Sequence, residues 1–163
     1  MNRLILVFSL IVFSLTLGVA GDKDSLKWLS FDQAKAEAAK SNKKILVDVY
    51  TDWCKWCKKM DADTYADPKV MKYLKEKFVI AKLNAESNDK VTYDGKKQTS
   101  AEFARLVGVE GFPTLLFFEP NGKVITSLSS YLDPSQMIHV AKFIGESKYE
   151  KMSFEEFEKN YKD

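Results

Sequence analysis

The stretch KKILVDVYTDWCKWCKKM, residues 43–60, sets an apolar run directly before both cysteines of the chain. Residues 43–50 are short, apolar and rich in β-branched side chains, which predicts a buried strand. Cys54 and Cys57 follow this strand, two residues apart, and a charged stretch compatible with a helix comes next. Such a pair can bind a metal, cross-link the fold or exchange electrons, and the rest of the sequence bears on the choice.

A purely structural role suits this cysteine pair poorly. A disulfide that closes so short a loop removes little entropy from the unfolded chain, and small secreted proteins that depend on cross-links carry several cysteines. A zinc site needs four ligands, but the one histidine, His139, lies far along the chain in a predicted helix, where we expect a surface or boundary residue. A c-type haem site would need histidine in place of Lys58. We therefore expect no metal and no bound cofactor.

The N-terminus resembles a secretion signal. After Arg3 come 18 residues without a charge, and then the sequence DKDS. Small residues at Gly18 and Ala20 predict cleavage after Ala20, which makes residues 1–20 a signal peptide and residues 21–163 a single domain. An uncleaved membrane anchor is the alternative, because about 18 apolar residues can just span a bilayer.

Composition describes an ordinary globular protein rather than a nucleic-acid-binding one. Hydrophobic residues make up 45% of the 163 residues and charged residues 29%, with a formal net charge of +2. The lysines are matched by acids along the chain, and Arg3 and Arg105 are the only arginines. We expect no nucleic-acid partner, and we expect a monomer.

The hydrophobic pattern predicts alternating strands and helices. Ser30 and Gln33 form a capping-box pattern for one helix, Asp67-Pro68 predicts a break in the helical stretch after the cysteines, and Asp94-Gly95 predicts a hairpin turn. The expected elements are a short strand at 26–31, a helix from 31, strands at 43–50 and 78–84, a polar insertion at 85–100, a helix at 100–107, a hairpin around 120–122, a helix at 134–147 and a short C-terminal helix with Phe154, Phe157 and Tyr161 on one face. This order predicts an α/β fold with a central mixed sheet and helices on both faces.

The order of these elements resembles the thioredoxin superfamily over nearly all of residues 21–163. The resemblance rests on WCxxC at a helix start and on Gly111-Phe112-Pro113-Thr114, in which Pro113 lies 59 positions after Cys54. The stretch VDVYTDWCKWCKKMDADTYADPKV is most similar to the C-terminal periplasmic domain of the thiol:disulfide interchange protein DsbD and to its single-domain secreted relatives. The resemblance implies the thioredoxin fold, thiol–disulfide oxidoreductase activity without a cofactor and a periplasmic location.

The position of the two cysteines predicts different chemical roles for them. Cys54 lies at a helix N-terminus, where unpaired N–H groups and the helix dipole favour the thiolate, and Lys55 and Lys58 add positive potential. Cys57 lies one turn later and can attack a mixed disulfide formed by Cys54. We expect Cys54 to be the nucleophile and Cys57 the resolving thiol.

Three charged residues are further candidates for the site. Burial in a strand should raise the pKa of Asp48. The resemblance implies that Asp48 exchanges a proton with the resolving cysteine and that Lys82 accompanies it. The alternatives are a hydrogen-bonded polar residue at the sheet edge for Asp48 and a solvated lysine for Lys82. Asp61 occupies a position at which DsbD-type domains carry an acid, although a solvated surface acid is the simpler interpretation.

The substrate-binding candidates are Trp53, Trp56, Phe112, Pro113 and Thr114. The resemblance implies a cis Phe112–Pro113 peptide bond beside the cysteines, whose backbone pairs with an extended substrate segment. The alternative is an ordinary trans proline that begins a strand. We expect Trp53 to pack against and shield the sulfur, and Trp56 to be exposed and to contact partners.

We therefore predict an exported thiol–disulfide reductase that acts on protein thiols and disulfides, with a membrane electron-transfer protein of the DsbD type as its electron source. Oxidised cysteines of exported proteins and apocytochromes are the expected substrates. The dipeptide Lys55-Trp56 matches neither reducing thioredoxins nor the oxidant DsbA. A disulfide-forming oxidase or isomerase therefore stays an alternative, as does a non-catalytic binding module or chaperone.

Overall fold

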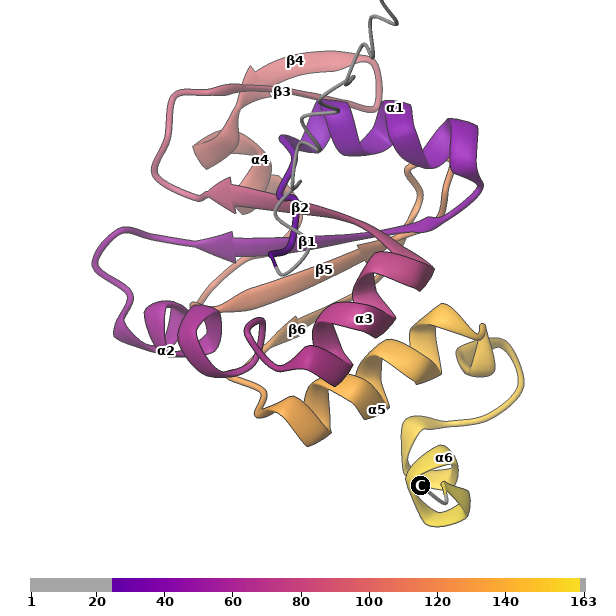
Figure 1. Cartoon of the computed structure of the whole chain (residues 1–163). Coiled ribbons are helices and arrows are strands. Elements are labelled where there is room, and N and C mark those ends of the chain that lie inside the picture. The colour runs from indigo at the N-terminus through magenta and orange to yellow at the C-terminus, as the bar shows by residue number, and fades with distance from the viewer. Residues whose placement is uncertain (1–24, 162–163) are drawn as a thin grey trace, which may run out of the picture.

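A four-stranded mixed sheet forms the centre of the computed structural model, which describes residues 25–161 (Figure 1). The proposed signal peptide lies outside these residues. The strand order is β2-β1-β5-β6, in which β1 pairs parallel with β2 and antiparallel with β5, and β6 pairs antiparallel with β5. The strands are β1 (Lys44–Tyr50), β2 (Phe78–Asn84), β5 (Thr114–Phe118) and β6 (Val124–Ser129). The predicted mixed sheet is confirmed.

Helices cover both faces of this sheet, as predicted. One face carries α1 (Phe31–Ser41) and α4 (Ser100–Leu106), and the other carries α2 (Lys55–Asp63), α3 (Pro68–Lys77) and α5 (Pro134–Gly145) (Figure 1). A 3-10 turn (Lys148–Glu150) and α6 (Phe154–Asn160) complete the chain. No helix within residues 25–161 is long and apolar enough to cross a membrane.

The helix boundaries follow from local capping chemistry. The Ser30 hydroxyl accepts from the Gln33 N–H while the Gln33 side chain accepts from the Ser30 N–H, which completes the expected capping box of α1. Asp67 is extended and caps the first turn of α3, and Pro68 follows at its first position. The predicted break at Asp67-Pro68 therefore separates two helices.

Strand β1 is buried on both faces, and its alternation decides which side chains face which helices. Ile45, Val47 and Val49 belong to the core under α1 and α4. Leu46 belongs to the core under α2, α3 and α5. Because alternate residues of a strand point to opposite faces, Asp48 shares the second face with Leu46.

The expected strand at 26–31 is wrong. Leu29 alone forms a bridge to Ala81 of β2, with its N–H donating to the Ile80 carbonyl and its carbonyl accepting from the Lys82 N–H. The pairing ends there because Ser30, the next residue, already caps α1.

The polar insertion forms the hairpin of β3 (Lys90–Tyr93) and β4 (Lys96–Thr99), with the predicted turn at Asp94-Gly95. Val91 is buried in the core under α1 and α4, and the Tyr93 ring lies 5.1 Å from that of Phe103. The hairpin is therefore part of the hydrophobic core.

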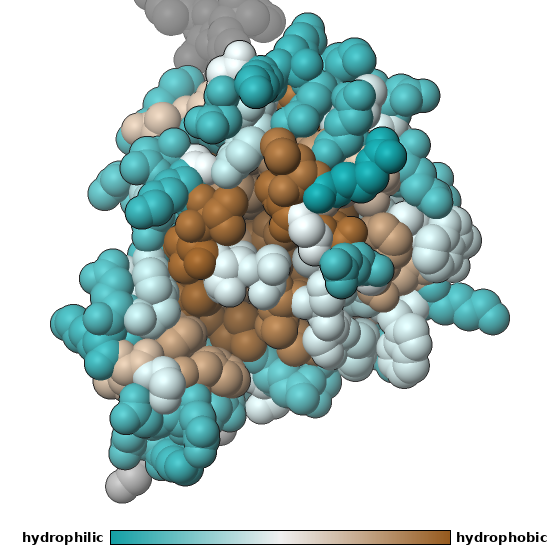
Figure 2. All heavy atoms as spheres, turned by 180° about the vertical axis from the view of Figure 1, so that it is seen from behind, coloured by the Kyte–Doolittle hydropathy of each residue, from teal (hydrophilic) through white to brown (hydrophobic). Residues whose placement is uncertain are grey.

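The side of the molecule opposite the view of Figure 1 has an apolar centre. Figure 2 shows hydrophobic side chains gathered in the middle of this face and polar side chains around them.

Candidate active site

The cysteine pair lies at the carboxyl end of β1, where the chain turns into α2 (Figure 1). Cys54 and Cys57 form a disulfide with their Cα atoms 5.3 Å apart. Cys54 is the N-cap of α2, and its Sγ accepts a hydrogen bond from the Cys57 N–H at 3.1 Å. Both residues are more than nine-tenths buried. Reduction would therefore leave the Cys54 sulfur facing a backbone donor that favours its thiolate.

The second element of the site is the Phe112–Pro113 peptide bond, which is cis. Pro113 directly precedes β5, whose first residue, Thr114, pairs with Val49 near the end of β1. The Phe112 ring meets the Trp53 ring edge-on, with centroids 5.8 Å apart. The structure thus brings the proline loop and the cysteine loop together at one end of the two central strands, β1 and β5.

The Thr114 side chain is enclosed within the fold. Its hydroxyl lies 2.7 Å from the Gly111 carbonyl and 2.6 Å from the Ser129 Oγ. These contacts fix the proline loop to β6. The side chain is therefore not available to a substrate.

Two exposed tryptophans border the disulfide. Trp53 is 62% exposed and Trp56 is 56% exposed. The expected shielding of the sulfur by Trp53 stays a prediction. The Trp53 ring packs edge-on against that of Phe112, and its Nε1–H donates to both carboxylate oxygens of Glu86, at 3.0 and 3.1 Å. The Trp56 ring lies 5.2 Å from that of Tyr131. Glu86 and Tyr131 come from distant loops, and no local pattern marked them.

Asp48 is a buried carboxylate on the sheet face that α2 covers. Only 1% of its surface is exposed, and neither carboxylate oxygen has a hydrogen-bond partner among the described residues. Burial raises its pKa to about 6, an effect that Lys82 opposes and Asp61 reinforces. Asp48 can therefore gain or lose a proton near neutral pH.

Lys82 and Asp61 complete a charged group around Asp48. The β1–β2 register sets Lys82 directly beside Asp48, and its Nζ lies 3.4 Å from Asp48 Oδ2. Lys82 also forms an ion pair with Asp61 of α2. The Lys82 side chain is only 20% exposed, so its interpretation as a solvated lysine is wrong. Asp61 is partly exposed but paired, so it is not a free surface acid.

Two aromatic residues near this charged group were not predicted. Tyr65, just after α2, is buried, and its hydroxyl has no hydrogen-bond partner among the described residues. Burial raises its pKa well above the usual value, and the charges of Asp48 and Asp61 add to this shift. Trp28, from the segment before α1, packs edge-on against Tyr65 at 4.8 Å. The Trp28–Tyr65 contact joins segments that are far apart in the sequence.

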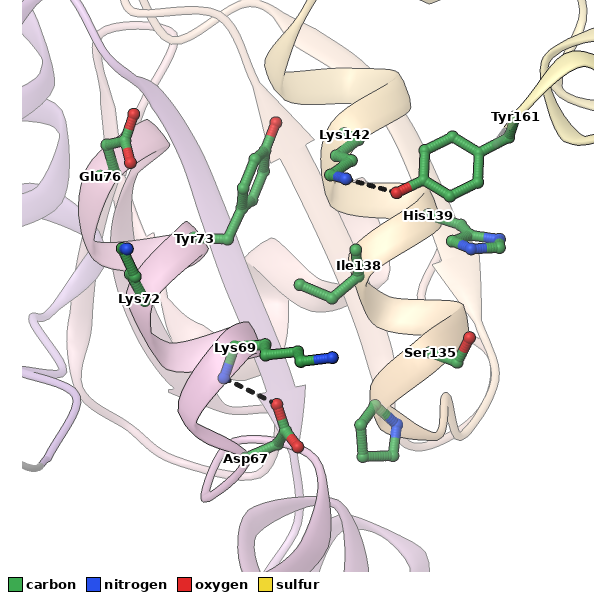
Figure 3. A pocket seen from close by; sticks show the side chains of 11 residues that line it. Asp67, Lys69, Lys72, Tyr73, Glu76, Ser135, Ile138, His139, Lys142 and Tyr161 are labelled. Carbon is green, nitrogen blue, oxygen red and sulfur yellow. Dashed lines mark hydrogen bonds between the residues drawn. The ribbon is translucent and has the colours of Figure 1, made fainter. Parts of the chain in front are cut away.

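The described residues also contain a cavity of about 610 Å³ away from the disulfide, between α3 and α5. Figure 3 shows Tyr73 of α3 and Ile138 of α5 facing each other across it, with Lys142 contacting the Tyr161 hydroxyl. His139 lies at its border, where its Nδ1 is 2.8 Å from a Glu158 carboxylate oxygen. None of the site residues lines this cavity, and no group of three or more potential metal ligands exists within residues 25–161.

Comparison with known proteins gives one consistent family. The model of the thioredoxin-like domain matches residues 31–145. DsbD of Actinobacillus pleuropneumoniae, named a thiol:disulfide interchange protein, is 29% identical over 103 residues, which are 62% of this chain and 16% of that protein. The chain thus spans about one sixth of the length of this relative.

Two solved structures extend this likeness. A putative disulphide-isomerase from Bacteroides thetaiotaomicron is 29% identical with a TM-score of 0.60, over 80% of this chain and 98% of that one. A thioredoxin-fold protein from Helicobacter pylori is 25% identical with a TM-score of 0.61, over 73% and 80% of the two chains.

Proposed function

Since the chain belongs to the thioredoxin-like domain family, we propose that it is a thiol–disulfide oxidoreductase that reduces disulfides of exported proteins. The observation that carries this proposal is the Cys54–Cys57 disulfide at the N-cap of α2, beside the cis Phe112–Pro113 bond. The similarity to DsbD supports exchange with protein thiols and disulfides.

The reaction starts from the reduced cysteine pair. The Cys54 thiolate attacks one sulfur of a substrate disulfide, forms a mixed disulfide and releases the other substrate sulfur as a thiolate. Cys57 then loses its proton and attacks the Cys54 sulfur, which forms the Cys54–Cys57 disulfide and releases the second substrate thiolate. The substrate gains two electrons, and two protons complete its thiols.

Asp48 is the base that accepts the Cys57 proton in this scheme. Its position on the face covered by α2 and its raised pKa support this role. Lys82 and Asp61 set the charge around it, because the ammonium group favours the carboxylate and Asp61 disfavours it. The exchange should therefore slow as pH falls through about 6, where Asp48 becomes protonated.

An extended substrate segment is held at the proline loop. The backbone before Pro113 pairs with the segment next to the substrate disulfide. Trp53 and Trp56 supply apolar surface near the cysteines, supported by their exposure and by their ring contacts with Phe112 and Tyr131.

The reducing direction needs a source of electrons for the compartment into which the protein is exported. A periplasm is kept oxidising, so a reductase there depends on a dedicated supply. The DsbD-type relatives support a membrane electron-transfer protein as the partner that reduces the Cys54–Cys57 disulfide. Export itself rests on the signal peptide predicted at residues 1–20, and the first residue of the mature protein distinguishes cleavage after Ala20 from a retained anchor.

A trapping experiment tests the exchange. Cys57→Ser should accumulate a mixed disulfide between Cys54 and a substrate protein, because the resolving thiol is missing. Non-reducing electrophoresis and mass spectrometry identify the linked species, and Cys54→Ser should trap none. If Cys57→Ser traps nothing that Cys54→Ser lacks, Cys54 is not the nucleophile and the mechanism is wrong.

A second candidate function is disulfide isomerisation or formation, which the likeness to the putative disulphide-isomerase favours. The reduction potential of the Cys54–Cys57 couple, measured in glutathione buffers, separates the directions. A value near −270 mV supports the reductase, and one near −120 mV supports an oxidant. A non-catalytic binding module would show no insulin reduction above that of Cys54→Ala.

A further inference from the structure

The ammonium group of Lys82 lies among three aromatic rings as well as between two carboxylates. Its Nζ is 5.0 Å from the centre of the Trp28 ring, 5.1 Å from that of Tyr50 and 6.0 Å from that of Tyr65. All three distances fall within the range of cation–π attraction, which is strongest for tryptophan and grows with desolvation.

The rings come from three separate parts of the chain. Tyr50 is the last residue of β1 and Tyr65 follows α2. Trp28 is brought in by the bridge at Leu29, whose carbonyl accepts the backbone N–H of Lys82 itself. The Trp28 ring then stands edge-on to the Tyr65 ring. The segment before α1 thus attaches to the residue whose side chain it covers.

These rings are important because Lys82 pairs with two carboxylates that differ in their exposure to water, Asp48 and Asp61. Asp61 is 45% exposed, so water can take the place of Lys82 there. Asp48 is 1% exposed, and Lys82 is the one cation paired with it among the described residues. A lysine ammonium is strongly hydrated and sits on a flexible stem, so without the rings it would move toward solvent and Asp61.

We propose that Trp28 is a positioning residue of the exchange reaction, which holds the Lys82 ammonium beside Asp48. This inference rests on the proposed function in one respect, namely that Asp48 accepts the proton of Cys57. Trp28 itself touches neither the cysteines nor the substrate in this scheme. Trp28 affects the reaction indirectly, because the position of the Lys82 ammonium changes the pKa of Asp48.

The direction of the effect follows from the groups that face Lys82. These are Asp48 and Tyr50 on β1, Asp61 on α2 and Tyr65 after α2. The segment before α1 contributes the uncharged Trp28. If Lys82 moves away while apolar cover remains, Asp48 loses the cation paired with it and its pKa rises. If water enters instead, the pKa of Asp48 falls.

The test is the titration of the Asp48 carboxyl carbon by NMR in the oxidised protein, with the signal assigned by its loss in Asp48→Asn. Trp28→Leu, which keeps an apolar side chain, should raise the pKa of Asp48 by about half a unit to one unit. Lys82→Met should raise it further. Trp28→Leu combined with Lys82→Met should equal Lys82→Met alone, because the indole acts through the ammonium.

Trp28→Phe is the matched control and should restore most of the wild-type pKa, since it keeps an aromatic face. A fall of the pKa in Trp28→Leu, or a shift that adds fully to that of Lys82→Met, would show that Trp28 only excludes water and would overturn the proposal. The titration uses no substrate, so its outcome is independent of whether the Cys57→Ser trap succeeds.

Discussion

At the level of single residues, the buried Asp48 carboxylate lowers the stability of the folded protein when it is charged. The pKa of its carboxyl rises from 3.8 to about 6 in the fold because burial removes water from the charged form. The folded protein therefore binds a proton that the unfolded chain releases between these pH values. By linkage, the free energy of unfolding falls as pH rises from about 4 to about 6.

Asp48→Asn should accordingly stabilise the protein at neutral pH. Each pKa unit corresponds to about 1.4 kcal/mol, so the gain above pH 6 relative to its value at pH 4 should reach about 3 kcal/mol. Urea unfolding of both proteins across this range measures it. Asp63→Asn, at an exposed carboxylate of α2, serves as control, and an equal pH dependence in both variants would contradict this account.

The exposed Trp56 side chain gives a second prediction about a single residue. Its ring is exposed and contacts Tyr131, and we propose that it covers an apolar part of the substrate. Trp56→Ala should raise KM for a disulfide-containing peptide about tenfold with little change in kcat. Val124→Ala, which also removes an exposed apolar side chain but at the far end of β6, should leave KM unchanged. A fall in kcat alone would assign Trp56 to the chemistry instead.

At the scale of elements, the β3–β4 hairpin shows how a polar insertion becomes structural. Its turn residues Asp94 and Gly95 have φ values of 51° and 75°, the geometry favoured by Asp-Gly in two-residue hairpins. On β3, the Thr92 N–H donates to the Asp32 carboxylate of α1, at 3.0 Å to the nearer oxygen. The hairpin thus joins α1 and contributes Val91 to the core.

Gly95→Ala should destabilise the protein by about 1 kcal/mol, measured as a lower urea midpoint with an unchanged slope. An added Cβ would meet nothing within 4 Å, so the cost is one of backbone conformation. Gly111→Ala is the matched control, because its Cβ would also meet open space and its backbone is not left-handed. Equal losses in both variants would contradict the assignment to the turn.

At the scale of the whole molecule, the site and the C-terminal helix lie at opposite ends (Figure 1). The disulfide loop is held by β1, α2 and the proline loop, and the core cluster that includes Leu46 of β1 and Met60 of α2 contains no residue of α6. Helix α6 is attached through aromatic rings, with Phe157 buried and its ring 5.4 Å from that of Phe143 on α5. This predicts that stability and activity can be changed separately.

Phe157→Ala should lower the free energy of unfolding by about 3 kcal/mol while the rate of insulin reduction stays at the wild-type value under folding conditions. Phe154→Ala, at a residue that is 39% exposed, should cost clearly less. Urea unfolding and the reduction assay measure the two effects. A parallel loss of activity in folded Phe157→Ala would show that α6 is coupled to the site.

Features controlled by local chemistry could be predicted from the amino-acid sequence. Buried strands at 43–50 and 78–84, the capping box at Ser30, the break at Asp67-Pro68 and the CxxC pair at a helix start follow from short-range patterns and turn preferences. With the proline motif, these patterns were sufficient to indicate the thioredoxin fold and the family.

The tertiary structure alone decided the environment of the site. The single bridge at Leu29, the hydrogen bond from Trp53 to Glu86, and the packing of Trp28 and Tyr65 around Lys82 join segments that are distant in the chain. Each depends on which side chains the sheet register and helix packing bring together. Burial and charge at Asp48 are set by these neighbours, so no local pattern contains them.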